Sequence, residues 1–396
     1  MRPSATLAIN EDSKRLIAEG RVVTRFGLGQ SPFPVPEVVV EALRSHAHEK
    51  DYLHVAGLPA LREAVASWYE RGGLRTRANE IFVGPGSKEL LFTVQLVCDA
   101  ELLVPSPCWV SYAPQARIAG RPCTLLPTSF SGRWRLTPEV LDRHCSTRHR
   151  ARLLILNYPG NPDGLSYTPA ELRALTEVLR RHRVLVVSDE IYGPMAHDGD
   201  HRSLAEFYPE GTLVSGGLSK WCGAGGWRVG TLRVPQELSW IHRAMSVVAS
   251  ETFSAVSAPT QYAAVTAFNE DLTGFLERQR AVLRWLVPRC TGPLRSAGVQ
   301  IHEPTGAFYF VGLIPGGGDA GAFCEELLEG AGVAVLPGAD FMRPAGELSF
   351  RLAYVDFDGA AALAEGADLE EVCAPTLDGI RRMAEFVARF SPKHSG

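Results

Sequence analysis

The sequence predicts an α/β protein with a large, mainly parallel sheet between helices. Short apolar runs alternate with amphipathic stretches through the middle of the chain, which is the pattern of parallel strands joined by helices. The 396 residues, 45% of them hydrophobic, suffice for two or three structural units. We expect an N-terminal segment (1–45) that joins a small domain, a large sheet domain (46–284) and a C-terminal small domain (285–396).

Four apolar runs predict buried strands, at 102–104, 153–156, 184–187 and 212–214. Between the second and the third, Thr168 can cap a helix, Pro169 suits its first position and Glu171 completes a capping box. Apolar residues then recur at helical spacing up to residue 179. These segments form a β-α-β unit.

Further elements are predicted on both sides of this unit. Residues 57–71 predict an amphipathic helix, and residues 81–98 predict a strand, a glycine-rich turn and a helix. A long amphipathic helix from about residue 281 leads to three more strands, at 307–311, 333–336 and 348–352, and to a final helix through residue 390.

The composition argues against several classes of partner and site. A net charge of −4 provides no basic field for nucleic acid or an anionic membrane. The chain has no apolar run of about 18 residues and no leader-like N-terminus, so we expect a cytoplasmic protein without a membrane span. The eight cysteines form no C-x-x-C pair and the eleven histidines show no ligand spacing, so we expect reduced thiols and no metal.

The segment SGGLSKWCGAGGWRVG (215–230) carries the strongest local signal for chemistry. Only five of the 40 basic residues are lysines, so Lys220 is conspicuous there. Its flanking glycines allow a close backbone approach to a reactive carbon, and Arg228 offers a planar fork for a phosphate. The alternative is a pair of surface charges beside a glycine-rich loop.

Three more segments place polar residues where strands are predicted to end, which is where open α/β sheets bind ligands. Asp189 follows a buried strand, with Tyr192 three residues later; a helix cap and a packed tyrosine would explain them equally well. Asn161 lies in the turn-rich loop NYPGNPDG (157–164). The turn GPGSK (84–88) before a helix suits an anion, although a capped helix start explains the same residues.

Together these segments resemble the class I/II aminotransferases of fold type I, the family that includes the aspartate, alanine and aromatic aminotransferases. The likeness extends from about Gly27 to Arg351, with several motifs in the family's order and spacing. It implies an enzyme with pyridoxal 5′-phosphate (PLP) as cofactor. It also implies a seven-stranded, mainly parallel PLP-binding sheet and a smaller α/β domain.

The resemblance also implies a role for each motif around the cofactor ring. Lys220 resembles the Schiff-base lysine that carries the proton between the substrate Cα and the cofactor. Asp189 resembles the partner of the pyridine nitrogen, and Tyr192 with Asn161 the partners of the ring oxygen O3′. Trp109, in PSPCWVSY, matches the aromatic residue that stacks on the ring.

Further matches concern the phosphate, the substrate and a second subunit. The phosphate contacts would come from Gly86, Ser87, Ser219 and Arg228. Lys88 lies beside them, where some aspartate-type members have a cation for the distal carboxylate. The substrate would meet Asn161, Trp109, Gly29 and Arg351, the last of which clamps its α-carboxylate. Tyr52 matches a tyrosine that reaches the phosphate of a neighbouring subunit, which implies a homodimer with shared active sites.

Two positions depart from the family's usual pattern. Asp163 replaces the threonine of the usual NPTG motif, so a charge enters a loop near the site and could alter substrate preference. Gly217 stands where a serine or threonine is frequent, three residues before Lys220; Ser215 or Ser219 could replace the lost phosphate contact.

The expected activity is a ping-pong transfer of the amino group of an L-amino acid, with aspartate or glutamate as candidate donors, to a 2-oxo acid. A PLP-dependent β-lyase or an aminocyclopropane-carboxylate synthase is an alternative on the same scaffold, separable by product analysis. A PLP-binding regulator is a further alternative. Such regulators have a DNA-binding domain before the motifs, and we expect none because the motifs here begin by Gly27.

Overall fold

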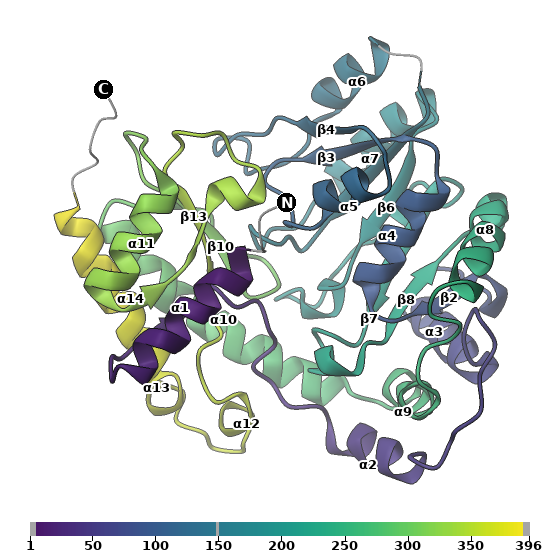
Figure 1. Ribbon diagram of the computed structural model, residues 1–396, viewed down its shortest axis with the longest axis horizontal. Coiled ribbons are helices and arrows are strands. Elements are labelled where there is room, and N and C mark those ends of the chain that lie inside the picture. Colours follow the sequence, from purple (N-terminus) through teal and green to yellow (C-terminus); the bar gives the residue numbers. More distant parts are fainter. Residues whose placement is uncertain (1–4, 148–149, 391–396) are drawn as a thin grey trace.

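A computed structural model of the protein describes residues 5–147 and 150–390 and contains a seven-stranded sheet (Figure 1). The strand order is β2-β8-β7-β6-β5-β3-β4, and only β8 runs antiparallel to its neighbours. The strands are β2 (Ile81–Gly84), β3 (Glu101–Pro105), β4 (Cys123–Leu126), β5 (Arg152–Asn157), β6 (Leu185–Asp189), β7 (Thr212–Gly217) and β8 (Gly230–Arg233). The predicted fold class is confirmed, and β3, β5, β6 and β7 are the four predicted strands.

Helices cover both faces of this sheet because alternate residues of its strands point to opposite sides. In β5, Leu153 and Ile155 pack under one set of helices, whereas Leu154 and Leu156 pack under the other. The first set is α4 (Ser87–Val97), α5 (Tyr112–Ile118) and α8 (Ser239–Ser250), and the second is α6 (Pro138–Ser146) and α7 (Pro169–Arg181). Beside the β2 edge pack α2 (Glu37–Ser45), α3 (Pro59–Arg71) and α9 (Ala258–Asn269).

The predicted start of α7 is confirmed in detail. The Thr168 hydroxyl accepts a 3.2 Å hydrogen bond from the Glu171 backbone N–H, and the Glu171 carboxylate accepts a 2.7 Å bond from the Thr168 N–H. This capping box satisfies two N–H groups that the helix itself leaves free. The helix predicted at 57–71 is α3, and the strand, turn and helix predicted at 81–98 are β2, the turn and α4.

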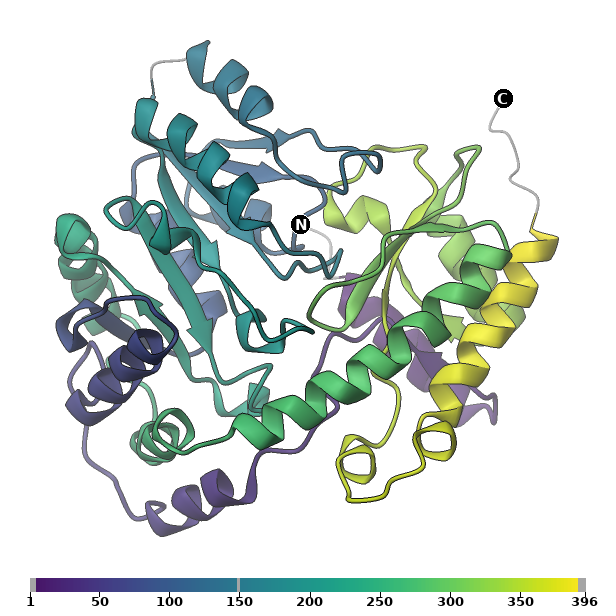
Figure 2. The same cartoon turned by 180° about the vertical axis from the view of Figure 1, so that it is seen from behind.

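A second, antiparallel sheet has the order β12-β13-β10-β9. Its strands are β9 (Gln300–Ile301), β10 (Tyr309–Leu313), β12 (Leu336–Pro337) and β13 (Ser349–Ala353). The helices of this part are α1 (Ala5–Ala18), α10 (Thr273–Ser296), α11 (Ala320–Ala331), α12 (Gly359–Ala362), α13 (Leu369–Val372) and α14 (Ala374–Arg389). The N-terminal segment joins it through a parallel pair, β1 (Thr24–Arg25) with β11 (Val333–Ala334). Seen from behind, α10 runs from the large sheet to this smaller part (Figure 2).

Two predictions of local structure were wrong. The long helix begins at Thr273 rather than near 281, and the Asp271 carboxylate just before it accepts a hydrogen bond from the Thr273 N–H. The apolar run 333–336 is not one strand, since β11 and β12 belong to different sheets. The domain boundaries stay predictions, and α10 is continuous across residue 285. No helix within the described residues is long and apolar enough to cross a membrane.

Candidate active site

The predicted site residues meet where the parallel strands of the large sheet end. Asp189 is the last residue of β6, Asn161 follows β5, and Lys220 follows β7. Because carboxyl ends of parallel strands lie at one edge of a sheet, three loops separate in sequence converge there. The smaller part and the N-terminal segment supply the opposite wall through Tyr309, Arg351 and other residues described below.

Asp189 is a buried carboxylate with one oxygen left free. Its side chain is 3% exposed, and the Tyr112 hydroxyl donates a 2.6 Å hydrogen bond to its Oδ2. Its Oδ1 has no hydrogen-bond partner in the part of the chain that is described. Burial raises the pKa of Asp189 to about 6, while the bond from Tyr112 opposes that shift. A buried carboxylate of this kind fits a protonated ring nitrogen, which would supply the missing partner.

Lys220 lies in the loop after β7 with its ammonium group turned to the N-terminal segment. Its Nζ donates a 2.7 Å hydrogen bond to the carbonyl of Gly29 and lies 5.5 Å from the centre of the Tyr192 ring. Burial, assisted by the positive charge of Arg351, lowers the pKa of Lys220 to about 8. A substantial fraction of this amine is therefore neutral near physiological pH, which a nucleophilic lysine requires.

Arg351 and Asn161 form a hydrogen-bonded pair in the site. Arg351, on β13, is 4% exposed, and its Nη1 donates a 3.3 Å hydrogen bond to Asn161 Oδ1. Its Nη2 donates to the carbonyl of Gly27, and its Nε has no partner among the described residues. A buried guanidinium with an unused donor suits a carboxylate ligand, because Arg and carboxylate pair in a planar, bidentate geometry.

The turn between β2 and α4 has the form of an anion site. Gly86 caps α4 with a φ of 89°, and no side chain caps the first turn of this helix. The Arg228 guanidinium lies against the turn: a Cβ added at Gly86 would be 2.1 Å from Arg228 Nη2. Backbone N–H groups, the positive end of a helix and a guanidinium together favour a phosphate, and Ser87 is the first helical residue.

The remaining predicted residues are Trp109, Lys88, Ser219 and Tyr52, and their surroundings differ. Trp109 packs edge-on against Tyr112, with ring centres 5.3 Å apart, and the Lys88 ammonium lies 5.0 Å from the Trp109 ring centre. Ser219 directly precedes Lys220 and is partly buried. Tyr52 is 94% exposed, so the single chain does not bring it to the site.

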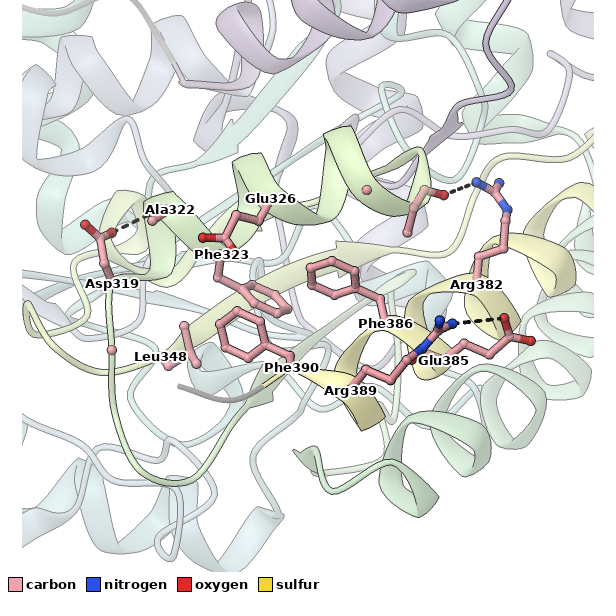
Figure 3. A pocket seen from close by; sticks show the side chains of 13 residues that line it. Asp319, Ala322, Phe323, Glu326, Leu348, Arg382, Glu385, Phe386, Arg389 and Phe390 are labelled. Carbon is pink, nitrogen blue, oxygen red and sulfur yellow. Dashed lines mark hydrogen bonds and ion pairs between the residues drawn. The ribbon is translucent and has the colours of Figure 1, made fainter. Parts of the chain in front are cut away.

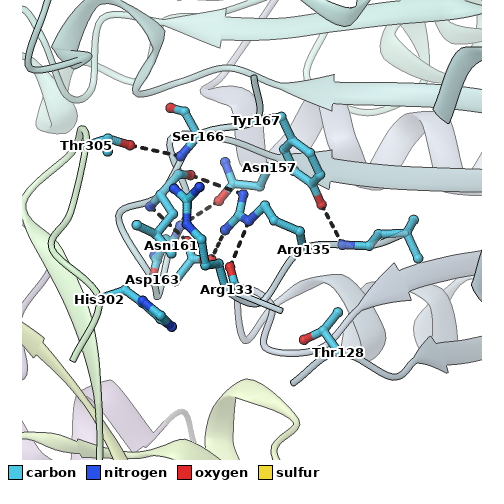
Figure 4. A network of polar contacts seen from close by, with 12 residues as sticks. Thr128, Arg133, Arg135, Asn157, Asn161, Asp163, Ser166, Tyr167, His302 and Thr305 are labelled. Atoms are coloured by element: carbon cyan, nitrogen blue, oxygen red, sulfur yellow. Dashed lines mark hydrogen bonds and ion pairs between the residues drawn. The ribbon is translucent and has the colours of Figure 1, made fainter. Parts of the chain in front are cut away.

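The two departures from the family pattern have clear structural settings. Asp163 forms a buried ion pair with Arg135, whose guanidinium also lies 4.5 Å from the Tyr167 ring centre (Figure 4). The charge that we expected to enter the site loop is therefore balanced inside the protein. Gly217 has a φ of 145°, and a Cβ there would lie 2.6 Å from the carbonyl oxygen of Val229, so a serine or threonine would strain this backbone.

A separate hollow of about 790 Å³ lies between α11 and α14. Figure 3 shows Phe323, Phe386 and Phe390 gathered there, with Arg389 bonded to Glu385 at the rim. None of the predicted site residues lines this hollow. It therefore plays no part in the site described above.

Sequence reasoning missed two tyrosines of the site. Tyr112 bonds to a residue 77 positions away, and the hydroxyls of Tyr309 and Tyr192 are 2.8 Å apart across 117 positions. Such distances along the chain leave no local pattern. A signal was available for Tyr112, which follows the predicted ring-stacking Trp109 by three residues and so starts the helix behind it.

Comparison with known proteins identifies the family. The family model described as aminotransferase class I and II matches residues 21–363. The chain belongs to the class I and II aminotransferases. It is therefore a PLP-dependent aminotransferase of fold type I, as the resemblance implied.

Several relatives of this aminotransferase are similar over most of their length. An aspartate aminotransferase of Geobacillus stearothermophilus is 35% identical, covering 87% of this chain and 90% of the relative. An aspartate/prephenate aminotransferase of Cereibacter sphaeroides is 33% identical, covering 94% and 95%. The crystal structure of the aspartate aminotransferase of Rhizobium meliloti superposes with a TM-score of 0.87 at 30% identity, covering 99% of this chain and 98% of that one.

Proposed function

We propose that this aminotransferase binds PLP through Lys220 and Asp189 and transfers the amino group of aspartate or glutamate to a 2-oxo acid by a ping-pong mechanism. The observation that carries the proposal is the pairing of a buried, half-satisfied carboxylate with a lysine of lowered pKa at one edge of the sheet. Strongly shifted titratable groups that share a cleft are typical of catalytic sites.

Each residue has a task that follows from its surroundings. PLP, when bound, supplies an electron-accepting ring for the bond that breaks at the substrate Cα. The free Oδ1 of Asp189 would hold the proton on the ring nitrogen, and Tyr112 keeps that carboxylate oriented. The neutral amine of Lys220 would carry the proton from the substrate Cα to the reactive carbon of the cofactor, on the other side of the substrate nitrogen. Arg351 and Asn161 orient the substrate through its α-carboxylate.

The turn at Gly86 and the guanidinium of Arg228 are proposed to hold the cofactor phosphate, with the hydroxyls of Ser87 and Ser219 as further donors. The Trp109 ring, which packs on Tyr112, is proposed to stack on the cofactor ring. Tyr192 and Asn161 are the proposed partners of the ring oxygen. These contacts would fix the cofactor at its phosphate, its face and its edge, so that the reactive carbon is held near Lys220.

Aspartate or glutamate is favoured as donor by a second cation beside the proposed cofactor site. Lys88 lies near enough to Arg228 that its pKa is lowered, first by partial burial and then by the positive charge of Arg228. One of these two cations can meet the phosphate and the other a distal carboxylate. Two of the relatives named above are aspartate aminotransferases and one is an aspartate/prephenate aminotransferase. The aspartate aminotransferase of Thermus thermophilus, 31% identical with a TM-score of 0.85, has a structure with the dicarboxylate maleate.

A homodimer with shared sites is proposed from Tyr52. A tyrosine that is 94% exposed suits a contact with another chain, because its large apolar ring is removed from water only when another chain covers it.

All eight cysteines are unpaired, which suits a reducing compartment such as the cytoplasm.

The proposed reaction is tested by the absorption spectrum of the PLP-loaded protein while amino acids are added singly, aspartate and glutamate first. We expect the cofactor band to convert to that of the amine form with one of these two, and a 2-oxo acid to restore it. Conversion only by other amino acids would refute the proposed donors. An unchanged band with pyruvate accumulating would instead identify a lyase reaction.

A further inference from the structure

Two tyrosine hydroxyls and a backbone carbonyl form a continuous hydrogen-bonded chain in the site. The hydroxyls of Tyr192 and Tyr309 are 2.8 Å apart, and the Tyr309 hydroxyl lies 3.2 Å from the carbonyl oxygen of Gly29. Both tyrosine side chains are buried. These hydrogen bonds therefore connect the large sheet, the smaller part and the N-terminal segment through three groups.

The Gly29 carbonyl at the end of this series determines which hydroxyl donates in each hydrogen bond. A carbonyl oxygen only accepts, so Tyr309 must donate its single proton to Gly29. Tyr309 can then only accept from Tyr192, whose proton is thereby turned toward Tyr309. In agreement, the pKa of Tyr192 is raised well above its usual value, first by burial and then by Tyr309. While Gly29 stays in place, the Tyr192 proton is not available to a third acceptor.

The position of Tyr309 is fixed from two sides. It begins β10, where Val311 pairs with Arg351 of β13, so Tyr309 and Arg351 lie on the same face of that sheet. The Arg351 guanidinium lies 4.9 Å from the Tyr309 ring centre. On the other side only a glycine permits the contact, because a Cβ at Gly29 would lie 2.3 Å from the Tyr309 oxygen. The carbonyl that Tyr309 meets is the one that accepts from Lys220.

We propose that Tyr309 is a positioning residue that sets the direction of the Tyr192 proton according to the place of Gly29. While Tyr309 donates to the Gly29 carbonyl, its hydroxyl oxygen accepts the hydrogen bond from Tyr192. Without the Gly29 contact, Tyr309 is free to donate to Tyr192, and Tyr192 to the ring oxygen of the cofactor. The inference rests on the proposed cofactor site, and it links the contact between Tyr309 and Gly29 to the electronic state of that ring.

The test is a pH titration of the cofactor absorption band in the PLP-loaded protein without substrate. In Tyr309→Phe the Tyr192 proton loses its acceptor and turns to the ring oxygen, where it stabilises negative charge. We expect the titration midpoint to fall by about 0.5–1 pH unit, the size of one hydrogen bond. Four charged groups act on Lys220 and are kept in every variant: Arg351, Asp189, Arg228 and Lys88.

Two further variants make the result specific. In a Tyr192→Phe background, Tyr309→Phe should leave the midpoint where it is, since no Tyr192 proton remains to redirect. Tyr354→Phe removes another fully buried hydroxyl near the same strand, 3.4 Å from the carbonyl of Ala307, and should not shift the midpoint.

The possible failures can be told apart. A wild-type protein that binds no PLP would overturn the proposed cofactor site. A normal wild-type band whose midpoint stays the same or rises in Tyr309→Phe would overturn the role of Tyr309 alone. The role of Tyr309 would also be overturned if Tyr309→Phe shifted the titration midpoint equally in the Tyr192→Phe background. Circular dichroism and PLP content of each variant check that all of them fold.

Discussion

The Tyr112 hydroxyl holds one oxygen of Asp189 at 2.6 Å and leaves the other without a partner among the described residues. We expect Tyr112→Phe to weaken PLP binding by about 10- to 150-fold, because a hydrogen bond to a charged group contributes about 1.5–3 kcal/mol. Titration of the cofactor-free protein with PLP measures this effect. Tyr354→Phe, which removes a buried hydroxyl away from Asp189, should bind PLP as the wild type does.

Lys220→Ala should abolish turnover, since Lys220 is the proposed carrier of the substrate proton. The variant should keep its fold, because the hydrogen bond that it loses within the described residues is the one to the Gly29 carbonyl. Initial rates with aspartate and 2-oxoglutarate measure the activity. Lys14→Ala, on the exposed side of α1, should retain full activity. A normal rate in Lys220→Ala would refute the central assignment.

The lowered pKa of Lys220 predicts a pH dependence of cofactor capture. The amine reacts only when neutral, so the rate at which the cofactor-free protein reacts with pyridoxal should rise about tenfold per pH unit below pH 8 and level off above it. An ordinary lysine would show no plateau until beyond pH 10. Stopped-flow absorbance between pH 6 and 10 would distinguish the two, and Lys220→Ala gives the background rate.

The lowered pKa of Lys220 also makes the stability of the folded protein depend on pH. Because the folded-state pKa of Lys220, about 8, lies below the ordinary value of 10.5, the folded protein binds fewer protons between these two values than the unfolded chain does. Its contribution to the free energy of unfolding therefore becomes more favourable as the pH rises through that window.

Asp163 and Arg135 form an ion pair whose two side chains are only 8% and 6% exposed. Asp163→Thr alone should lower the free energy of unfolding by about 3–5 kcal/mol, because it leaves Arg135 buried and unpaired. Adding Arg135→Met should recover much of that loss. Urea unfolding of both variants tests this.

A matched surface pair provides the control for this ion pair. Arg381 and Glu385 lie one turn apart on α14 with side chains 61% and 48% exposed. Glu385→Gln should change the free energy of unfolding by less than about 0.5 kcal/mol. Equal losses for Asp163→Thr and Glu385→Gln would show that burial does not govern the strength of the first pair.

The sequence was most informative where local rules determine the structure. The capping box at Thr168 and Glu171 and the four central strands could be predicted because each depends on residues close together in the chain. The edge strand β4 escaped detection since it is largely exposed and has no apolar run. The strand β8 was hidden because it begins within a glycine-rich segment that we interpreted as a loop.

The site was predictable to the extent that its residues follow strand ends. Lys220, Asp189 and Asn161 come together as expected because parallel strands end at one edge. Tyr309 could not be predicted, since its role depends on how a strand of the second sheet is placed against the first. The balance of Asp163 by Arg135 was hidden for the same reason: the two residues are 28 positions apart in different loops.

The carbonyls of Gly27 and Gly29 make the protein's own backbone an internal competitor for its ligands. Arg351 and Lys220, the two cations that we propose to engage the ligands, donate to these oxygens. Binding is then an exchange, and a ligand gains only the difference between its own bond and the one it displaces. A carboxylate forms a stronger bond with a guanidinium than a neutral carbonyl does, whereas an uncharged analogue offers no such gain. Discrimination against uncharged analogues would thus originate partly in main-chain atoms rather than in side chains alone.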